Sequence, residues 1–507
     1  MPSRSVWNWL GPVLVLLIAV GTRVWNLGTP HVLVFDETFY VKDAWTLWNN
    51  GYESTWLNEA DKAFNAGDTS TFTKTGSFVV HPELGKWLIA LGMGAFGASN
   101  AFGWRIAVAI AGILIVALVM LVAKRLTGSM ALATIAGFLM AIDGHAIVLS
   151  RVGLLDNFVT LFSLLGFLFI VIDRQRNLPR LLAWVNARRH ARPENSATWG
   201  PTLWARPYLV LAGLAFGLAI SIKWSGLYFL AAFAVYVVVM DALDRRRVGL
   251  PFWFTAAVLK QAPATFLLMV PIAAVTYLST WTSWILTSGG YDRQLVTDNP
   301  SLRWTGFFSW VPDRFQSLWA YHLSAYNFHV SLSTPHSYQA NPLTWLFMTR
   351  PTSMFYVGDK LGENGCTFDS CASAITALAN PLIWWGGTAA VLYLVFRLFR
   401  FREWQVGIIL MGMVAGYLPW LMYLNRTVFQ FYGIVYEPYM VLALTVMFGI
   451  WLGTPSDGPE RRRAGRRWVI VFLVLASLLS IFFFPLWTGM QIPYWFWQIH
   501  MWLPGWI

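Results

Sequence analysis

The chain has 507 residues, of which 57% are hydrophobic and only 12% are charged. Soluble domains carry about 25% charged residues, so this composition excludes a soluble globular protein. A formal charge of +12 can indicate nucleic-acid binding, but here the cations gather in short loops between apolar runs, which is a topology signal. We therefore predict an all-α polytopic protein that lies in a lipid bilayer and binds no nucleic acid.

Eleven apolar runs approach the roughly 20 residues with which a helix crosses about 30 Å of hydrocarbon. They are 10–27, 104–123, 130–149, 154–172, 207–222, 225–241, 262–280, 378–396, 405–423, 435–452 and 468–486. No small-residue cleavage site follows the first run, which favours a retained span over a signal peptide. With residues 1–9 in the cytoplasm, Lys and Arg concentrate in the cytoplasmic loops, as the positive-inside rule requires. This orientation predicts a multi-pass cell-membrane protein whose two long segments, 28–103 and 281–377, lie outside the cytoplasm.

The first outer segment opens with two adjacent acids, Asp36 and Glu37, in the sequence VLVFDETFYVKDAWTLW. Aromatic and aliphatic residues then recur at helical spacing over residues 39–48, which predicts a short amphipathic helix at the membrane surface. Asp36 could simply cap that helix. Alternatively, both acids belong to a site at this surface.

The motif HPELGK, which contains His81, Pro82 and Lys86, comes later in the same segment. The apolar stretch that follows it, 86–98, is too short to span and is expected to be re-entrant or interfacial. A histidine before a proline is more often a loop residue than a ligand. No spacing typical of a divalent-metal site occurs, so we expect no metal.

Further charged residues lie inside or against the apolar runs, where a membrane normally rejects them. Arg105, Arg151 and Lys223 could be snorkelling anchors, and Arg151 could form a structural pair with Asp156. The alternation of spans nevertheless brings the whole set to the outer face, which predicts a polar cavity that opens outward. The set comprises Lys86, Arg105, Asp143, Arg151, Asp156, Lys223, Arg426 and Glu437, together with the acid pair.

Such a cavity suits group transfer from a phospholipid-like donor. Its cations could stabilise the charge that develops on a phosphate leaving group, and a carboxylate opposite them could accept a proton from an incoming hydroxyl. The sequence has no glycine-rich nucleotide loop, which agrees with a donor that is activated before it reaches the outer face.

The second outer segment contains the only two cysteines of the chain, Cys366 and Cys371. Outside the cytoplasm a disulfide between them could close a short loop, and two unpaired thiols are the alternative. The tail QIPYWFWQIHMWLPGWI is rich in tryptophan, which indicates an anchor at the membrane interface.

Taken in order, the acid pair, HPELGK, SRVGLLDNF, SIKWSGLYF, NPLIWW and FYGIVYEPY resemble the motifs of protein O-mannosyltransferases of the GT-C membrane glycosyltransferase class. The resemblance covers essentially the whole chain and is closest to actinobacterial members, which lack a soluble MIR domain. It implies one GT-C domain over 1–507, with no MIR domain in 281–377. It also implies inverting transfer of mannose from polyprenyl-phosphate-mannose to Ser or Thr of secreted polypeptides, near the Sec translocon and without a metal cofactor.

The resemblance also implies residue roles. Asp36 matches the catalytic acid, expected to be the general base, and Glu37 matches a neighbour held by a cation. The basic positions Arg105 and Arg151 and the acid Asp156 match a group associated with the donor phosphate or with site integrity. By extrapolation, Lys223 and Arg426 join that group. His81, Pro82 and Lys86 belong to the loop motif beneath the acceptor groove, and Asn341, Trp345 and Tyr432 are added to it by extrapolation. Glu437 and Tyr439 receive no catalytic role because relatives vary there.

Two other functions stay open at this point. A GT-C enzyme could use the same donor on a lipid or glycan acceptor, because loops build the acceptor groove. A secondary transporter is disfavoured, since no inverted repeat of broken helices is seen and the polar residues gather at one face instead of the midplane.

Overall fold

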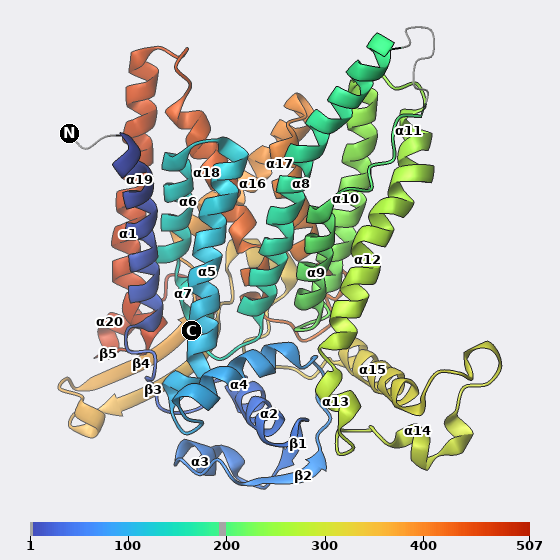
Figure 1. Ribbon diagram of the computed structural model, residues 1–507. Coiled ribbons are helices and arrows are strands. Elements are labelled where there is room, and N and C mark those ends of the chain that lie inside the picture. The colour runs from blue at the N-terminus through green and yellow to red at the C-terminus, as the bar shows by residue number, and fades with distance from the viewer. Residues whose placement is uncertain (1–3, 192–198) are drawn as a thin grey trace.

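The computed structural model describes residues 4–191 and 199–507, and it consists of a helical bundle above a layer of loops and short elements (Figure 1). Seven helices of the described residues are long and apolar enough to cross a membrane. They are α5 (Ala101–Thr127), α8 (Asp156–Ala191), α10 (Gly226–Arg247), the helix made by α11 (Trp253–Ala256), η1 (Ala257–Gln261) and α12 (Ala262–Ser279), α16 (Pro381–Phe401), α17 (Trp404–Gly416) with η6 (Leu418–Met422), and α19 (Pro459–Thr488).

Four shorter apolar helices coincide with the other predicted runs. They are α1 (Arg4–Val24), α6 (Met130–Ile142), α9 (Pro207–Ile220) and α18 (Glu437–Leu452). Every predicted run therefore overlaps a helix, and the membrane-embedded helical architecture is confirmed. The exact number of eleven crossings stays a prediction, because α6, α9 and α18, with 13, 14 and 16 residues, are short for a full span.

One predicted run is interrupted. The run 130–149 divides into α6 and α7 (Gly144–Leu149) at Asp143, whose side chain accepts hydrogen bonds from the backbone N–H groups of His145 and Ala146. The carboxylate satisfies N–H groups that have no partner at the start of a helix. Asp143 therefore caps α7 inside the apolar run.

The layer below the bundle, which we call the outer layer, consists of residues 25–100 and 280–380 (Figure 1). Its helices are α2 (Glu37–Asn50), α3 (Ala60–Asn65), α4 (Leu84–Phe96), α13 (Thr282–Leu286), α14 (Leu295–Asp298) and α15 (Asp313–Ser331), with short turns η2 (Pro300–Leu302), η3 (Gly306–Phe308), η4 (Pro342–Phe347) and η5 (Glu363–Gly365). The predicted amphipathic helix is present as α2. It packs on α4, and its Val41, Ala44 and Leu47 are buried, while Phe39 and Trp48 are exposed.

Two small antiparallel sheets in the outer layer were not predicted. One pairs β1 (Ser54–Trp56) with β2 (Phe72–Gly76). The other has the order β3 (Thr352–Lys360), β4 (Ser370–Ala377), β5 (Gln491–Pro493). A disulfide joins Cys366 to Cys371 across the β3–β4 connection, with 5.9 Å between the two Cα atoms. The chain ends with α20 (Tyr494–Gln498) and η8 (Pro504–Trp506).

Close packing of α9 against α12 fixes the place where α9 ends. A Cβ atom added at Gly213 would lie 2.6 Å from the carbonyl oxygen of Met269, and one at Gly217 would lie 2.7 Å from Cβ of Thr276. Such distances are well inside van der Waals contact, so glycine permits the approach. The turn that follows α9 carries Lys223 and thereby delivers it to the site described next.

Candidate active site

A cavity of about 230 Å³ lies where the bundle meets the outer layer. Its walls come from α15, the start of α8, the α9–α10 junction and the segment before α18, which includes η7 (Gln430–Val435). Of the residues expected at a site, it brings together His81, Asp156, Lys223, Arg426 and Tyr432. Of the ten charged residues predicted to share one cavity, Asp156, Lys223 and Arg426 therefore line it, although up to 270 residues separate them in sequence.

Lys223 forms an ion pair inside this cavity. Its Nζ atom lies 2.7 Å from a carboxylate oxygen of Asp156, and both side chains are largely buried. The same ammonium faces the rings of Tyr40 and Tyr432, at 5.7 and 5.2 Å from their centroids. Cation–π contacts and a paired carboxylate together offset the cost of burying this charge.

Glu37 of the acid pair is completely buried and fully bonded. Arg105 donates to both of its carboxylate oxygens at 2.8 Å. The backbone N–H groups of Val34 and Gly153 donate to them as well, at 2.9 and 2.7 Å. A carboxylate with four such donors is committed to structure.

The side chains of Arg105 and Arg151 are likewise engaged in structural hydrogen bonds. Arg105 also donates to the carbonyl oxygens of Leu27, Pro30 and Val32, and only 1% of it is exposed. The guanidinium of Arg151 donates to four backbone carbonyl groups of residues 22–26, at the end of α1. Neither arginine is a snorkelling anchor, and Arg151 does not pair with Asp156. Of the two roles expected for these arginines, the geometry favours site integrity over contact with the donor phosphate.

Asp36 differs from its neighbour. It precedes α2, but its side chain makes no capping hydrogen bond, so the simple capping alternative is wrong. Among the described residues no hydrogen bond or ion pair engages its carboxylate. Burial raises the pKa of the Asp36 carboxyl to about 6, Lys223 opposes the rise, and Asp156 adds to it. A carboxylate near the cavity charges, with a free lone pair and a raised pKa, has the properties of a general base.

The residue before Asp36 holds an unusual backbone conformation. Phe35 has φ 49°, in the left-handed region that bulky residues rarely adopt. Its ring makes edge contacts with His336, Phe429 and Phe431, at centroid distances of 6.0, 5.7 and 5.6 Å. This packing stabilises a turn that directs the chain from the loop into α2 and fixes the position of Asp36.

Arg426 is the cation without an acidic partner at the cavity. In the described part of the chain no carboxylate lies within ion-pair distance of it, and its Nε atom is buried without a hydrogen-bond partner. Its Nη2 atom donates to Nδ1 of His329 at 2.9 Å. An arginine that lines a cavity without a counter-ion is suited to bind an anion.

The residues of the HPELGK motif have different places, because one lines the cavity and the others lie outside it. His81 lines the cavity and its ring stacks on that of His329 at 5.2 Å. Lys86 is buried away from the cavity, where it pairs with Glu53 and donates to the carbonyl oxygen of His81 at 3.0 Å. Pro82 lines a smaller neighbouring space.

Two residues expected at the acceptor groove are placed elsewhere. Asn341 caps η4 by accepting from the N–H of Leu343 at 3.0 Å, so its side chain serves that turn. Trp345 is fully buried and supports the cavity wall from behind, in contact with the rings of Trp420 and Tyr432. Neither lines the cavity itself.

Asp143 and Glu437 also lie outside the cavity. Glu437 is 2.6 Å from Nδ1 of His145, and Asp143 accepts from the backbone of Asn380 in addition to capping α7. These side chains connect helices inside the bundle, in agreement with the absence of an assigned role for Glu437.

Among the residues of the cavity wall that sequence reasoning did not single out are Tyr228, Tyr423 and His329. The hydroxyl groups of Tyr228 and Tyr423 form a hydrogen bond of 2.8 Å, and His329 lies on α15. Tyr228 falls in the motif SIKWSGLYF, so that motif contained a signal. His329 had none, because an outer-layer helix with several aromatic residues gives no reason to single out one histidine.

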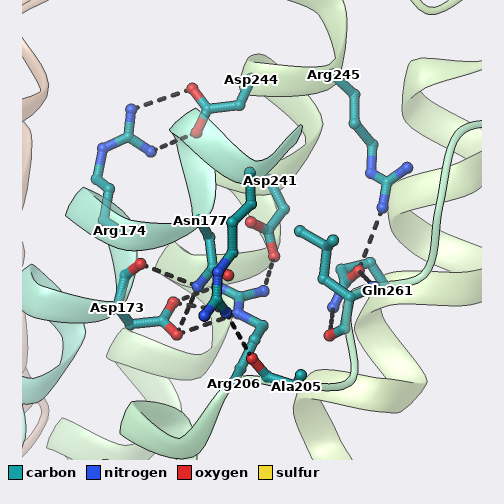
Figure 2. A network of polar contacts seen from close by, with 11 residues as sticks. Asp173, Arg174, Asn177, Ala205, Arg206, Asp241, Asp244, Arg245 and Gln261 are labelled. Atoms are coloured by element: carbon teal, nitrogen blue, oxygen red, sulfur yellow. Dashed lines mark hydrogen bonds and ion pairs between the residues drawn. The ribbon is translucent and has the colours of Figure 1, made fainter. Parts of the chain in front are cut away.

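A second buried polar network lies beside the middle of α8, the start of α9 and the last turns of α10, apart from the cavity (Figure 2). Asp173 and Asp241 bracket Arg206 at 2.5 Å each, and Arg174 pairs with Asp244 at 2.7 Å. Arg245 donates to backbone carbonyl groups of the segment that leads into α9. The space among these side chains is only about 20 Å³, close to the volume for one water molecule.

Comparisons with known proteins agree over the whole chain. Residues 13–287 match the family described as dolichyl-phosphate-mannose-protein mannosyltransferase, and residues 314–506 match the C-terminal four-transmembrane region of protein O-mannosyltransferase. Proteins named polyprenol-phosphate-mannose--protein mannosyltransferase are similar to the full chain. Those of Mycolicibacterium smegmatis and Mycobacterium tuberculosis are 32% identical, with 94% and 93% of their lengths covered. The one of Corynebacterium glutamicum is 30% identical, with 95% covered.

Solved structures show the same fold at low sequence identity. The S. cerevisiae protein O-mannosyltransferase Pmt1-Pmt2 complex bound to the sugar donor aligns with a TM-score of 0.73 and 14% identity, over 100% of this chain and 93% of that one. The Archaeoglobus fulgidus oligosaccharyltransferase aligns with a TM-score of 0.50 and 17% identity, over 96% of this chain and 57% of that one. The described bundle therefore has the same overall fold as these membrane enzymes.

Proposed function

The chain belongs to the dolichyl-phosphate-mannose-protein mannosyltransferase family, and from this premise we propose that it transfers mannose, with inversion, from polyprenyl-phosphate-mannose to Ser or Thr hydroxyl groups of secreted or membrane proteins. It is a membrane-embedded glycosyltransferase of the GT-C class. The observation that carries the residue assignment is the contrast inside the cavity region. Asp36 has an uncommitted carboxylate, Arg426 has an uncommitted positive charge, and the neighbouring charges are paired.

Asp36 is the general base of the proposed reaction. The acceptor hydroxyl oxygen attacks C1 of mannose, its proton passes to the Asp36 carboxylate, and the bond between C1 and the phosphate oxygen breaks. One displacement of this kind inverts the configuration at C1. With a pKa of about 6, the Asp36 carboxylate is still mostly ionised near neutral pH, and the raised pKa makes it a stronger base than an ordinary aspartate.

Arg426 receives the phosphate that leaves. The charge of the phosphate group grows as the bond to mannose breaks, and a fixed cation in a poorly solvated cavity stabilises that change. Lys223 adds a second positive charge nearby, although Asp156 neutralises part of it. The hydroxyl groups of Tyr228 and Tyr423 on the same wall provide neutral hydrogen-bond donors.

Several properties of the proposal come from the family and from topology. The polyprenyl chain of the donor would lie in the bilayer beside the cavity, and the acceptor would reach Asp36 from the outer layer. The orientation with a cytoplasmic N-terminus, residence in the plasma membrane and proximity to the Sec translocon belong to the proposal. So does metal independence, which full activity in excess EDTA would support.

The test is a transfer assay with purified protein in liposomes. Labelled polyprenyl-phosphate-mannose is incubated with a peptide rich in Ser and Thr, and with the same peptide in which Ala and Val replace these residues. Label on the hydroxyl peptide alone is expected, and it should disappear in Asp36→Asn. Label on a lipid or glycan acceptor, with none on peptide, would overturn the proposed acceptor and favour a GT-C enzyme of different specificity.

A further inference from the structure

His329 connects three segments that are far apart in the sequence. It lies on α15, near the end of that helix, and lines the cavity. Its Nε2 atom is 2.8 Å from the carbonyl oxygen of Val80, directly before the HPELGK motif. Its Nδ1 atom is 2.9 Å from Nη2 of Arg426, in the segment before α18.

These two partners determine the protonation state of the imidazole ring. A carbonyl oxygen only accepts, so Nε2 must carry the hydrogen that it donates to Val80. A guanidinium only donates, so Nδ1 must present its lone pair to Arg426. Both bonds exist together only in the neutral ring with hydrogen on Nε2. A second proton would set an N–H group against Arg426 and add a positive charge beside it.

The surroundings favour that neutral form. Burial lowers the pKa of His329 to about 4, the Val80 carbonyl opposes the fall, and Arg426 and Lys223 add to it. His81 stacks on the ring at 5.2 Å, and Trp224 approaches it edge-on at 5.9 Å. The ring is therefore fixed between aromatic neighbours as well as by its two hydrogen bonds.

We infer that His329 is a positioning residue for donor binding, which holds the Arg426 guanidinium toward the cavity and ties it to the loop that carries His81. This inference rests on the proposed function, because it assumes that Arg426 meets the donor phosphate. Without an acceptor at Nδ1, the Arg426 side chain could rotate among many conformers, and ordering it would reduce the affinity for the donor.

Two substitutions of His329 each remove one of its two hydrogen bonds and keep the other. The Asn side chain reaches about as far as Nδ1, so His329→Asn keeps an amide oxygen for Arg426 and loses the bond to Val80. The longer Gln side chain reaches about as far as Nε2, so His329→Gln keeps a donor for Val80 and leaves Arg426 without its acceptor. We expect the dissociation constant for polyprenyl-phosphate-mannose to rise roughly tenfold in His329→Gln, since the lost bond involves a charged group, and to change little in His329→Asn.

The measurement is donor-dependent thermal stabilisation of the purified full-length protein in detergent, which reports affinity without any transfer step. The same titration in the Arg426→Ala background completes a double-mutant cycle. If His329 acts through Arg426, His329→Gln has no further effect on donor affinity in that background. His322→Gln is the matched control, since His322 lies on the same helix and bonds to Tyr277 and Leu318 outside the cavity.

Equal losses of affinity in His329→Asn and His329→Gln, or an undiminished effect of His329→Gln in the Arg426→Ala background, would overturn the inference and give His329 a general structural role. A wild-type protein that binds the donor but modifies no hydroxyl peptide would instead overturn the proposed acceptor. In that case the affinity cycle would still decide the role of His329.

Discussion

The two polar regions formed by residues of α8, α10 and the segments next to α9 contain similar residues but differ in how their charges are paired. In the network of Figure 2, the carboxylates of Asp173, Asp241 and Asp244 all pair with arginine, and the enclosed space holds about one water molecule. In the cavity of about 230 Å³, Lys223 and Asp156 are paired, whereas Arg426 has no carboxylate partner among the described residues. The uncommitted carboxylate of Asp36 lies near these charges without lining the space. Charged side chains that are all paired around a space too small for a ligand indicate a structural role. Unpaired charged side chains beside a larger cavity indicate a catalytic or binding role.

The acid pair repeats this contrast between adjacent residues. Glu37 accepts four hydrogen bonds and holds Arg105 inside the protein, whereas Asp36 accepts none among the described residues. Two carboxylates that are equivalent in a sequence motif therefore have separate roles. The following predictions test the distinction, beginning with the largest expected effect.

Asp36→Asn should reduce kcat by roughly 10²–10⁴-fold, the usual contribution of a general base. The amide has nearly the same shape as the carboxylate and no hydrogen bond is lost, so the Tm should stay close to that of the wild type. Initial rates of mannose transfer and a thermal melt test both statements. Near-normal turnover would remove Asp36 from the mechanism.

Arg206→Ala should have the opposite effect, a loss of stability with little change in kcat. It leaves Asp173 and Asp241 buried without their partner, which typically costs about 3–5 kcal/mol of stability. Denaturation in detergent should show this loss, while kcat per folded molecule at low temperature stays within about twofold of the wild type. A selective loss of kcat in a stable variant would show that the Figure 2 network has a catalytic function after all.

Arg426→Ala should weaken donor binding by roughly 10–100-fold, because a hydrogen bond to a charged group contributes about 1.5–3 kcal/mol. The protein should fold normally, since this arginine forms no ion pair among the described residues. Titration with polyprenyl phosphate and with its mannosylated form measures the effect. Equal affinity in wild type and variant would return Arg426 to a structural role.

The pH dependence of kcat/KM should follow the ionisation of the Asp36 carboxyl group. Its pKa of about 6 means that the carboxylate is ionised above pH 6 and becomes protonated below it. The value of kcat/KM should therefore be level near neutral pH and fall by about tenfold per pH unit below 6. A profile level down to pH 4.5 would contradict the assignment of the base.

The smallest effect is expected for the double variant Cys366→Ser, Cys371→Ser. Closing so short a loop contributes about 2 kcal/mol in the chain-entropy model, and the hairpin lies apart from the cavity. The Tm should fall slightly and mannose transfer should be unchanged. Loss of transfer without unfolding would give the hairpin a part in acceptor binding.

Sequence reasoning recovered the bundle well, because hydrocarbon imposes length and hydropathy on every span. It missed the break at Asp143 and both small sheets, since a capping carboxylate and short strand pairings leave no apolar period, and the pairing of β4 with β5 joins segments about 120 residues apart. For the site, the unusual position of the charges identified Asp36, Lys223 and Arg426. It could not show which charges were already paired, because Glu37 and Arg105 are 68 residues apart and their contact exists only in the folded chain.

The strand β5 has a consequence for biosynthesis. Its partner β4 directly precedes α16, and four apolar helices, α16 to α19, separate the two strands along the chain. The β3–β4 hairpin can form as soon as it emerges outside the membrane, but the third strand can join only after those helices have been inserted in the correct order. Completion of this sheet would therefore report that the C-terminal half has reached its final topology, and antibodies against the three-stranded form would distinguish finished molecules from insertion intermediates.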